Sequence, residues 1–205
     1  MKYFIALVIS LIGLFVFGII LETEYAHELK TVFIFLTLLF AFLWEYSVLG
    51  KIFESDFKLR SQRKSIGIFD IGYALCWTLF ILFLSDHSES LVYLVFAFWA
   101  IPFAELMMWF VYKKQKPFTL FINGDELILN NRWTQKRNLT ELTQIRYDRF
   151  SKNLKLYFKS KSHIPIKTKE YHVDDIQKLF EILIEKSEYK VSIPQNYEPK
   201  LKNSN

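Results

Sequence analysis

Four long apolar segments constrain this chain more than any other feature of its sequence. They cover residues 3–21, 31–49, 66–84 and 91–112. At 1.5 Å per helical residue, each segment is about 30 Å long, which is the thickness of the hydrocarbon core of a bilayer. A segment that crosses lipid alone must satisfy its own backbone hydrogen bonds, which predicts a helix for each. The sequence therefore predicts an all-α membrane bundle of four helices over residues 1–112.

Positive charge is concentrated in the second half and in one connection of the first half. Residues 1–112 carry a formal net charge of −3 and residues 113–205 carry +8. The basic residues of the connection between the second and third segments, and those that follow the fourth segment, are Lys51, Lys58, Arg60, Arg63, Lys64, Lys113, Lys114 and Lys116. Because Lys and Arg near span ends stay in the cytoplasm, this pattern predicts a multi-pass protein of the inner cell membrane with both termini cytoplasmic. The other two connections are short and acidic, and we expect them outside.

Three acidic residues interrupt the apolar segments: Glu45, Asp70 and Glu105. They lie at similar depths, each near the predicted cytoplasmic end of a different helix. A charge at such a depth costs at least ~2–3 kcal/mol unless it is shielded, so these side chains usually face the interior of a bundle. One hypothesis is a polar pocket that takes a cation or a proton. The other is that each acid pairs with a nearby basic residue or reaches the membrane surface, and the sequence leaves both open.

From Pro117 the hydrophobic period changes to two, which indicates β-strands with one wet face. A two-residue hairpin signal, Asn123-Gly124, separates the first two predicted strands. The predicted strands cover 118–122, 126–130, 132–137, 142–147, 154–158 and 163–167, the last at an edge because it contains Pro165. Apolar residues at helical spacing then predict a helix over 174–185. We expect residues 191–205 to be a disordered tail.

About six strands closed by one amphipathic C-terminal helix form an order that resembles the bacterial pleckstrin-homology-like domains of small membrane proteins. The resemblance covers residues 117–190 and is carried by the hairpin 118–130, the stretch 139–145, the strand 154–158 and the closing helix. It implies a small cytoplasmic α+β domain that binds or scaffolds rather than catalyses. The segment is shorter than a full pleckstrin-homology domain, which leaves it one strand short. No phosphoinositide-binding signature carries over onto these residues.

The sequence indicates no catalytic residues, no metal site and no cofactor. Its four histidines lack metal-ligand spacing on a helix, and its one cysteine, Cys76, lies in an apolar segment. Phosphate-binding and dinucleotide-binding glycine patterns are missing from the sequence. The leading hypothesis is a non-enzymatic membrane protein whose cytoplasmic domain binds a protein partner or the anionic inner leaflet. A small transport or channel component that uses the intramembrane carboxylates, and an immunity-type protein against a membrane-active toxin, remain alternatives.

Six basic residues are the candidates for binding lipid headgroups or a partner: Lys113, Lys114, Lys116, Arg132, Lys136 and Arg137. The first three follow the fourth apolar segment directly. The other three fall on what is predicted to be one wet strand, and we expect that strand to face anionic headgroups. Nucleic acid is not expected as a partner, because basic residues on the cytoplasmic side of a membrane protein already have a simpler cause. The sequence does not determine the oligomeric state.

Overall fold

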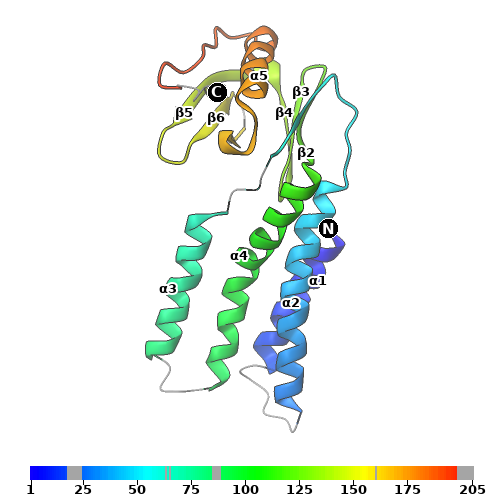
Figure 1. The fold of residues 1–205 in the computed structure, drawn as a ribbon, viewed down its shortest axis with the longest axis vertical. Coiled ribbons are helices and arrows are strands. Elements are labelled where there is room, and N and C mark those ends of the chain that lie inside the picture. Colours follow the sequence, from blue (N-terminus) through cyan, green and yellow to red (C-terminus); the bar gives the residue numbers. More distant parts are fainter. Residues whose placement is uncertain (18–24, 63, 65, 85–88, 160, 198–205) are drawn as a thin grey trace, which may run out of the picture. The chain divides into compact units, whose positions relative to one another are not determined.

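A computed structural model describes residues 1–17, 25–62, 64, 66–84, 89–159 and 161–197 (Figure 1). The chain divides into two compact units. The first, the helical unit, contains Met1–Gly50 and Ile66–Val111, and the second, the sheet unit, contains Lys51–Ser65 and Tyr112–Asn205. The connection between the second and third predicted spans therefore belongs to the sheet unit and not to the helical unit.

The helical unit contains α1 (Lys2–Phe15), α2 (Ala26–Leu49), α3 (Ile68–Leu84) and most of α4 (Glu89–Gln115). Two stretches, His27–Leu49 and Val92–Gln115, are long and apolar enough to cross a membrane. The helices Lys2–Phe15 and Ile68–Phe83 are apolar but shorter over the described residues. The structure thus has helices in the first half with two candidate spans, which is less than the four spans predicted from the sequence. Residues 18–21 of the first predicted span lie outside the described residues.

Small side chains allow α1 and α2 to pack closely. Gly13 lies directly against the ring of Phe33, so a larger residue at position 13 would displace that ring. Ser10 and Thr37 are buried between the two helices, and the Thr37 hydroxyl donates to Ser10 Oγ at 3.2 Å. Pairs of small polar residues of this kind are a common means of joining helices in apolar surroundings.

Large aromatic side chains join α3 to α4 instead. The rings of Trp77 and Phe98 stack with centroids 5.2 Å apart. The indole N–H of Trp99 donates to the hydroxyl of Thr78 at 3.0 Å. Pro102 lies inside α4 and leaves one carbonyl of that helix without its usual intrahelical donor.

The sheet unit has two antiparallel sheets and one long helix, α5 (Val173–Lys186). The first sheet has the order β1 (Phe57–Arg60), β2 (Phe118–Asn123), β3 (Glu126–Asn130) and β4 (Thr134–Asn138). The second has the order β5 (Leu142–Asp148), β6 (Asn153–Phe158) and β7 (Ile164–Lys167). Short 3-10 helices, η2 (Leu139–Glu141) and η3 (Thr168–Glu170), precede β5 and α5.

The predicted sheet of about six strands is corrected to four plus three strands. The added strand, β1, lies outside residues 117–190, in the connection between α2 and α3. The hairpin of β2 and β3 is confirmed, and Gly124 at its turn has the positive φ of 52° that favours glycine. The edge position of β7 is confirmed, whereas the polar strand predicted over 132–137 begins only at Thr134.

Strand β1 is fixed to the sheet unit along its whole length. Leu59 pairs with Leu120 in the register of β1 and β2, and its side chain is 1% exposed. Just before the strand, the Asp56 N–H donates to the Ile122 carbonyl at 2.9 Å. Just after the strand, the Ser61 N–H donates to the Pro117 carbonyl, also at 2.9 Å. The segment is therefore an integral strand of the first sheet.

One hydrophobic core joins the two sheets to α5 (Figure 1). The first sheet contributes Leu59, Leu120, Ile122, Leu127 and Leu129; the second contributes Leu142, Ile145, Leu154, Leu156, Phe158, Ile164 and Ile166; and α5 contributes Ile176, Leu179, Phe180 and Leu183. The helical spacing that predicted α5 marks its buried face.

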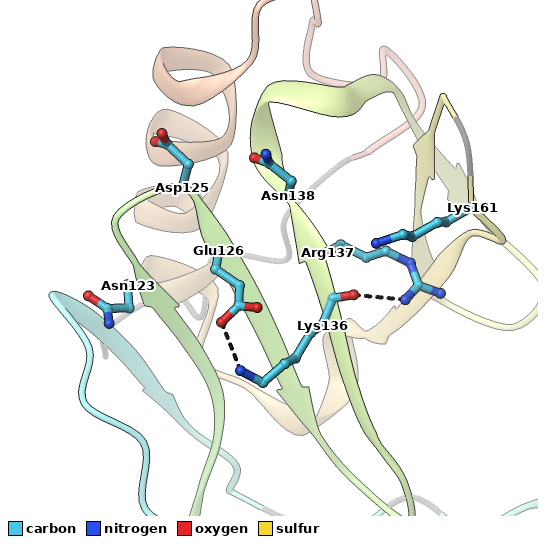
Figure 2. Close-up of a pocket in the computed structure, with 7 residues that line it drawn as sticks. All are labelled: Asn123, Asp125, Glu126, Lys136, Arg137, Asn138 and Lys161. Atoms are coloured by element: carbon cyan, nitrogen blue, oxygen red, sulfur yellow. Dashed lines mark hydrogen bonds and ion pairs between the residues drawn. The ribbon is translucent and has the colours of Figure 1, made fainter.

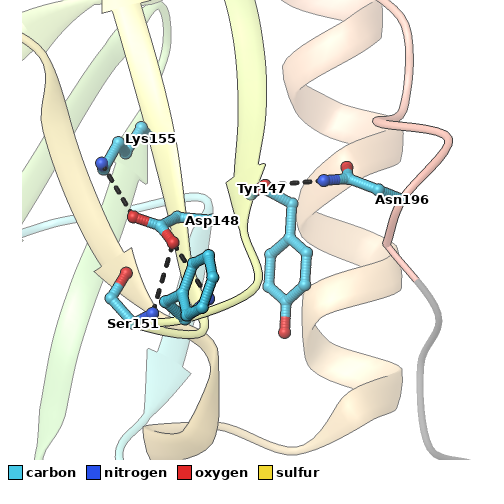
Figure 3. A network of polar contacts seen from close by, with 6 residues as sticks. Tyr147, Asp148, Ser151, Lys155 and Asn196 are labelled. Carbon is cyan, nitrogen blue, oxygen red and sulfur yellow. Dashed lines mark hydrogen bonds and ion pairs between the residues drawn. The ribbon is translucent and has the colours of Figure 1, made fainter.

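The segment that follows α5 packs on this core, contrary to the prediction of a disordered tail from residue 191. Val191 is buried, and the ring of Tyr197 contacts the rings of Tyr147 and Phe180 with centroids 5.1 Å apart in both cases. The Asn196 side chain donates to the Tyr147 carbonyl at 2.8 Å (Figure 3). Burial raises the pKa of the Tyr197 hydroxyl. Residues 198–205 lie outside the described residues.

We expect Leu59→Ala to lower the free energy of unfolding of the sheet unit by about 2–5 kcal/mol, because it opens a cavity in the core. Ile52→Ala is the matched control in the same segment, since Ile52 is 85% exposed, and should change it by about 0.5 kcal/mol or less. Hydrogen exchange of the β6 amides, measured on the full chain in detergent, gives the free energy of unfolding of both variants. Equal effects of the two substitutions would show that β1 does not stabilise the unit.

Candidate functional site

Two of the three acids in the apolar segments meet at the start of α3. Glu105, on α4, is 3% exposed, and its Oε2 accepts the Gly67 N–H at 2.8 Å. Asp70 lies in the first turn of α3, and its carboxylate touches the place where a Cβ of residue 67 would be. The same Cβ would lie 3.3 Å from Glu105 Oε2. Both carboxylates therefore lie against the backbone of Gly67.

This arrangement favours glycine at position 67 and negative charge around it. The Gly67 carbonyl accepts the Ile71 N–H at 3.2 Å, which makes Gly67 the residue that caps α3. The first N–H groups of a helix have no intrahelical acceptor, and the helix macrodipole favours anions at that end. Glu105 supplies the acceptor from another helix, and Asp70 adds charge from within the first turn. The two acids thus stabilise the start of α3.

No group of three or more potential metal ligands from His, Cys, Asp and Glu occurs among the described residues. Glu45, the third acid, is 3% exposed on α2, one turn after the buried Ala41. The structure brings Asp70 and Glu105 together at Gly67 and places Glu45 on another helix. A cation or proton site formed by these acids stays a prediction.

Three of the basic candidates lie at the junction of α4 and β2. Lys113 and Lys114 are in the last turn of α4, where the helix macrodipole favours positive charge. Lys116 follows the helix with a φ of 45°, and its N–H donates to the Tyr112 carbonyl at 2.9 Å. This is the left-handed geometry that ends many helices. The junction from Gln115 to Phe118 therefore consists of two residues with a fixed backbone.

The other three basic candidates do not share one face. Arg132 precedes β4, and Lys136 and Arg137 are neighbours within it, so their side chains point to opposite faces of the sheet (Figure 2). Lys136 pairs with Glu126 at 2.9 Å, whereas Arg137 donates to the Ser162 hydroxyl at 3.1 Å. The expectation that all three lie on one strand is therefore wrong, and whether any of them faces headgroups stays a prediction. Their binding of lipid or a partner remains a prediction for each residue separately.

A hollow of about 350 Å³ at this end of the first sheet contains charges of both signs (Figure 2). Its lining residues are Asn123, Asp125, Glu126, Lys136, Arg137, Asn138 and Lys161. Besides the pair of Lys136 with Glu126, the Asp125 carboxylate lies 3.7 Å from the Lys186 ammonium. Both acids of the hollow have a basic neighbour, so the net positive charge of its lining comes from Arg137 and Lys161.

The turn between β5 and β6 is a feature that sequence analysis missed. One carboxylate, that of Asp148, organises it by accepting the N–H groups of Phe150 at 3.0 Å and Ser151 at 3.3 Å (Figure 3). The Lys155 ammonium donates to the same carboxylate at 3.0 Å. The hydrogen bond from Lys155 and those from Ser151 lower the pKa of Asp148 to about 2, and the bond with Asp148 raises the pKa of Lys155.

The sequence does contain a signal for this turn. An aspartate whose side chain bonds the backbone two residues later is a recurrent turn former, and Asp148 follows an alternating strand at that spacing. Lys152 has a φ of 53° and closes the turn before β6. Phe150 at its tip is fully exposed.

Comparison of the chain with known protein families, with curated proteins and with solved structures found no match.

Substitutions at the start of α3 should test the hydrogen bond between Glu105 and the Gly67 N–H. Glu105→Leu removes both the acceptor and the charge from the Gly67 N–H, and we expect a loss of about 1.5–3 kcal/mol in the stability of the helical unit. Glu105→Gln keeps an acceptor and should cost less. Gly67→Ala should also destabilise the unit, because its Cβ would displace the Asp70 side chain. Thermal unfolding in detergent measures all three, and a Glu105→Leu variant as stable as the parent would contradict this role.

The turn at Asp148 should loosen in acid. The folded pKa of Asp148 is about 2 and its ordinary value is 3.8, so its stabilising effect is present above pH ~4 and is lost as the pH falls toward 2. Hydrogen-exchange protection of the Phe150 and Ser151 amides should decline over that interval. Asp148→Asn keeps an acceptor but does not titrate, so its protection should not change with pH there. A parent protein without this decline would show that the carboxylate does not hold the turn.

Proposed function

We propose that the chain is a non-enzymatic membrane protein in which four helices cross the inner membrane and the sheet unit binds at the cytoplasmic surface. In this proposal the sheet unit is a pleckstrin-homology-like module, and its ligand is the anionic inner leaflet or a protein partner. Both termini are cytoplasmic.

The pairing of β1 with β2 carries this proposal. The two strands lie in one sheet, so residues 57–60 and 118–123 must be on the same side of any membrane. If α4 crosses, then α3 must cross as well, because the chain returns to its starting side only after an even number of spans. The 17 residues of α3 extend about 25 Å, close to the thickness of the hydrocarbon core.

The distribution of charge supports the same topology. The segment that contains β1 carries Lys51, Lys58, Arg60 and Lys64 among its described residues, and α4 ends in Lys113 and Lys114. Both stretches are basic, as expected for cytoplasmic flanks of membrane spans. The strand pairing places both stretches on one side, and their charge supports the proposal that this side is the cytoplasm.

The strand count supports the pleckstrin-homology-like assignment. Residues 117–190 alone are one strand short of such a domain, and β1 supplies a strand from the connection between α2 and α3. The resulting order is four strands, then three strands, then a closing helix. Domains of this kind act by binding, which is why we propose a binding function. Glu105 bonds the residue that caps α3 and Asp70 lies beside it, which favours a structural role for these acids over the transport alternative.

Cysteine labelling in a Cys76→Ala background tests the topology. Ile52→Cys and Glu181→Cys, both at exposed positions of the sheet unit, should react with an impermeant maleimide in inside-out vesicles and not in intact spheroplasts. Ser88→Cys, in the connection between α3 and α4, should show the opposite pattern. Labelling of residues 52 and 88 from one side would mean that α3 does not cross, and the proposal would be wrong.

A further inference from the structure

The turn between β5 and β6 holds an apolar side chain out in solvent. The Phe150 side chain is 101% exposed, whereas phenylalanine is usually buried. The backbone that carries it is fixed on both sides, because Asp148 bonds the N–H groups of residues 150 and 151. The Lys152 carbonyl also accepts the hydroxyl of Thr168 at 2.8 Å. A turn with this many bonds holds the backbone of Phe150 in one position, so the ring always leaves the turn from the same point.

Positive charge flanks the ring on both sides. Arg149 directly precedes Phe150, and Lys152 follows it after Ser151. Both basic side chains are exposed. The one carboxylate of the turn, Asp148, is already paired with Lys155. The tip therefore offers an aromatic ring and two cations, which is the combination found on surfaces that enter the headgroup region of anionic membranes.

A series of contacts leads from the tip to the residues that follow α4. Lys152 is bonded to Thr168 in η3, and two residues later the Glu170 carbonyl accepts the Ser61 hydroxyl at 3.4 Å. The Ser61 N–H in turn donates to the Pro117 carbonyl at 2.9 Å. Pro117 is in the two-residue junction after α4. This series of contacts within the sheet unit links the tip to the point where a candidate span ends.

We propose that this turn is a membrane anchor, in which Phe150 enters the headgroup region of an anionic leaflet and Arg149 and Lys152 contact lipid phosphates. The proposal depends on the proposed function, because it requires α4 to end at a membrane surface. It assigns the lipid contact to a turn that contains none of the six basic residues singled out from the sequence.

The chemistry of the tip favours lipid over a protein partner. A stable protein interface buries more than about 1,000 Å² and usually has several apolar side chains at its centre. The described tip has one exposed ring between two cations, which suits insertion among headgroups. A rigid turn also loses little conformational entropy when it docks.

Spin labels on the full chain in nanodiscs test the anchor. With Ser151→Cys in a Cys76→Ala background, the label next to the intact ring should be several-fold less accessible to a water-soluble nickel chelate in phosphatidylglycerol discs than in phosphatidylcholine discs. A label at Glu181→Cys on α5 is the matched control and should not change. Arg149→Gln and Lys152→Gln should each lower the docking equilibrium constant about fivefold at low salt. Phe150→Ala should lower it as well.

The label on native Cys76 separates the two proposals. Cys76 is exposed on the apolar α3, so a label there should be reached by oxygen and protected from the nickel chelate if α3 lies in lipid. If Cys76 is in lipid but residue 151 is equally accessible in both kinds of disc, the anchor is wrong while the proposed function stands, and the exposed ring is left for a protein partner. If the nickel chelate reaches Cys76, both proposals are wrong.

Discussion

The pairing of β1 with β2 is the interaction on which the rest of the structure depends. It takes four residues from between two apolar helices and places them at the edge of a sheet whose other strands all follow α4. Leu59 is then part of the core shared by both sheets and α5. Because this contact joins segments far apart in the chain, the sheet unit can form only after both apolar helices between them have been made. The same contact imposes an even number of membrane crossings between the two segments.

Sequence patterns were sufficient to predict the elements whose conformation depends on neighbouring residues. The Asn123-Gly124 hairpin, the alternation in β6 and the helical spacing of α5 depend on neighbouring residues, and each was predicted. Strand β1 was missed because it is four residues long, contains one fully buried side chain and owes its conformation to a partner strand after α4. The ordered segment at Val191 was missed for a similar reason. Its apolar contacts involve residues of β5 and α5 that are distant in sequence.

The sequence identified candidate residues but could not predict which groups they contact. Asp70 and Glu105 were singled out because a carboxylate in an apolar segment is costly, and the structure brings them to one backbone group. The sequence could not show that this group is the N–H of Gly67. Lys136 and Arg137 were grouped because they fall on one predicted strand, although strand geometry places the side chains of neighbours on opposite faces. Phe150 was overlooked because an apolar residue in a short connection carries no signal until its exposure is known.

The short connections to the apolar helices change what affinity the sheet unit needs. Two residues separate α4 from β2, so in a membrane-inserted chain the tip would search a small volume next to the leaflet. Docking is then an intramolecular step at a high effective concentration, and contacts too weak to recruit a free domain are sufficient to orient a tethered one. An anchor of this kind would therefore serve orientation more than recruitment. One ring and two cations are enough for that task, and the rest of the sheet unit is left available for a partner.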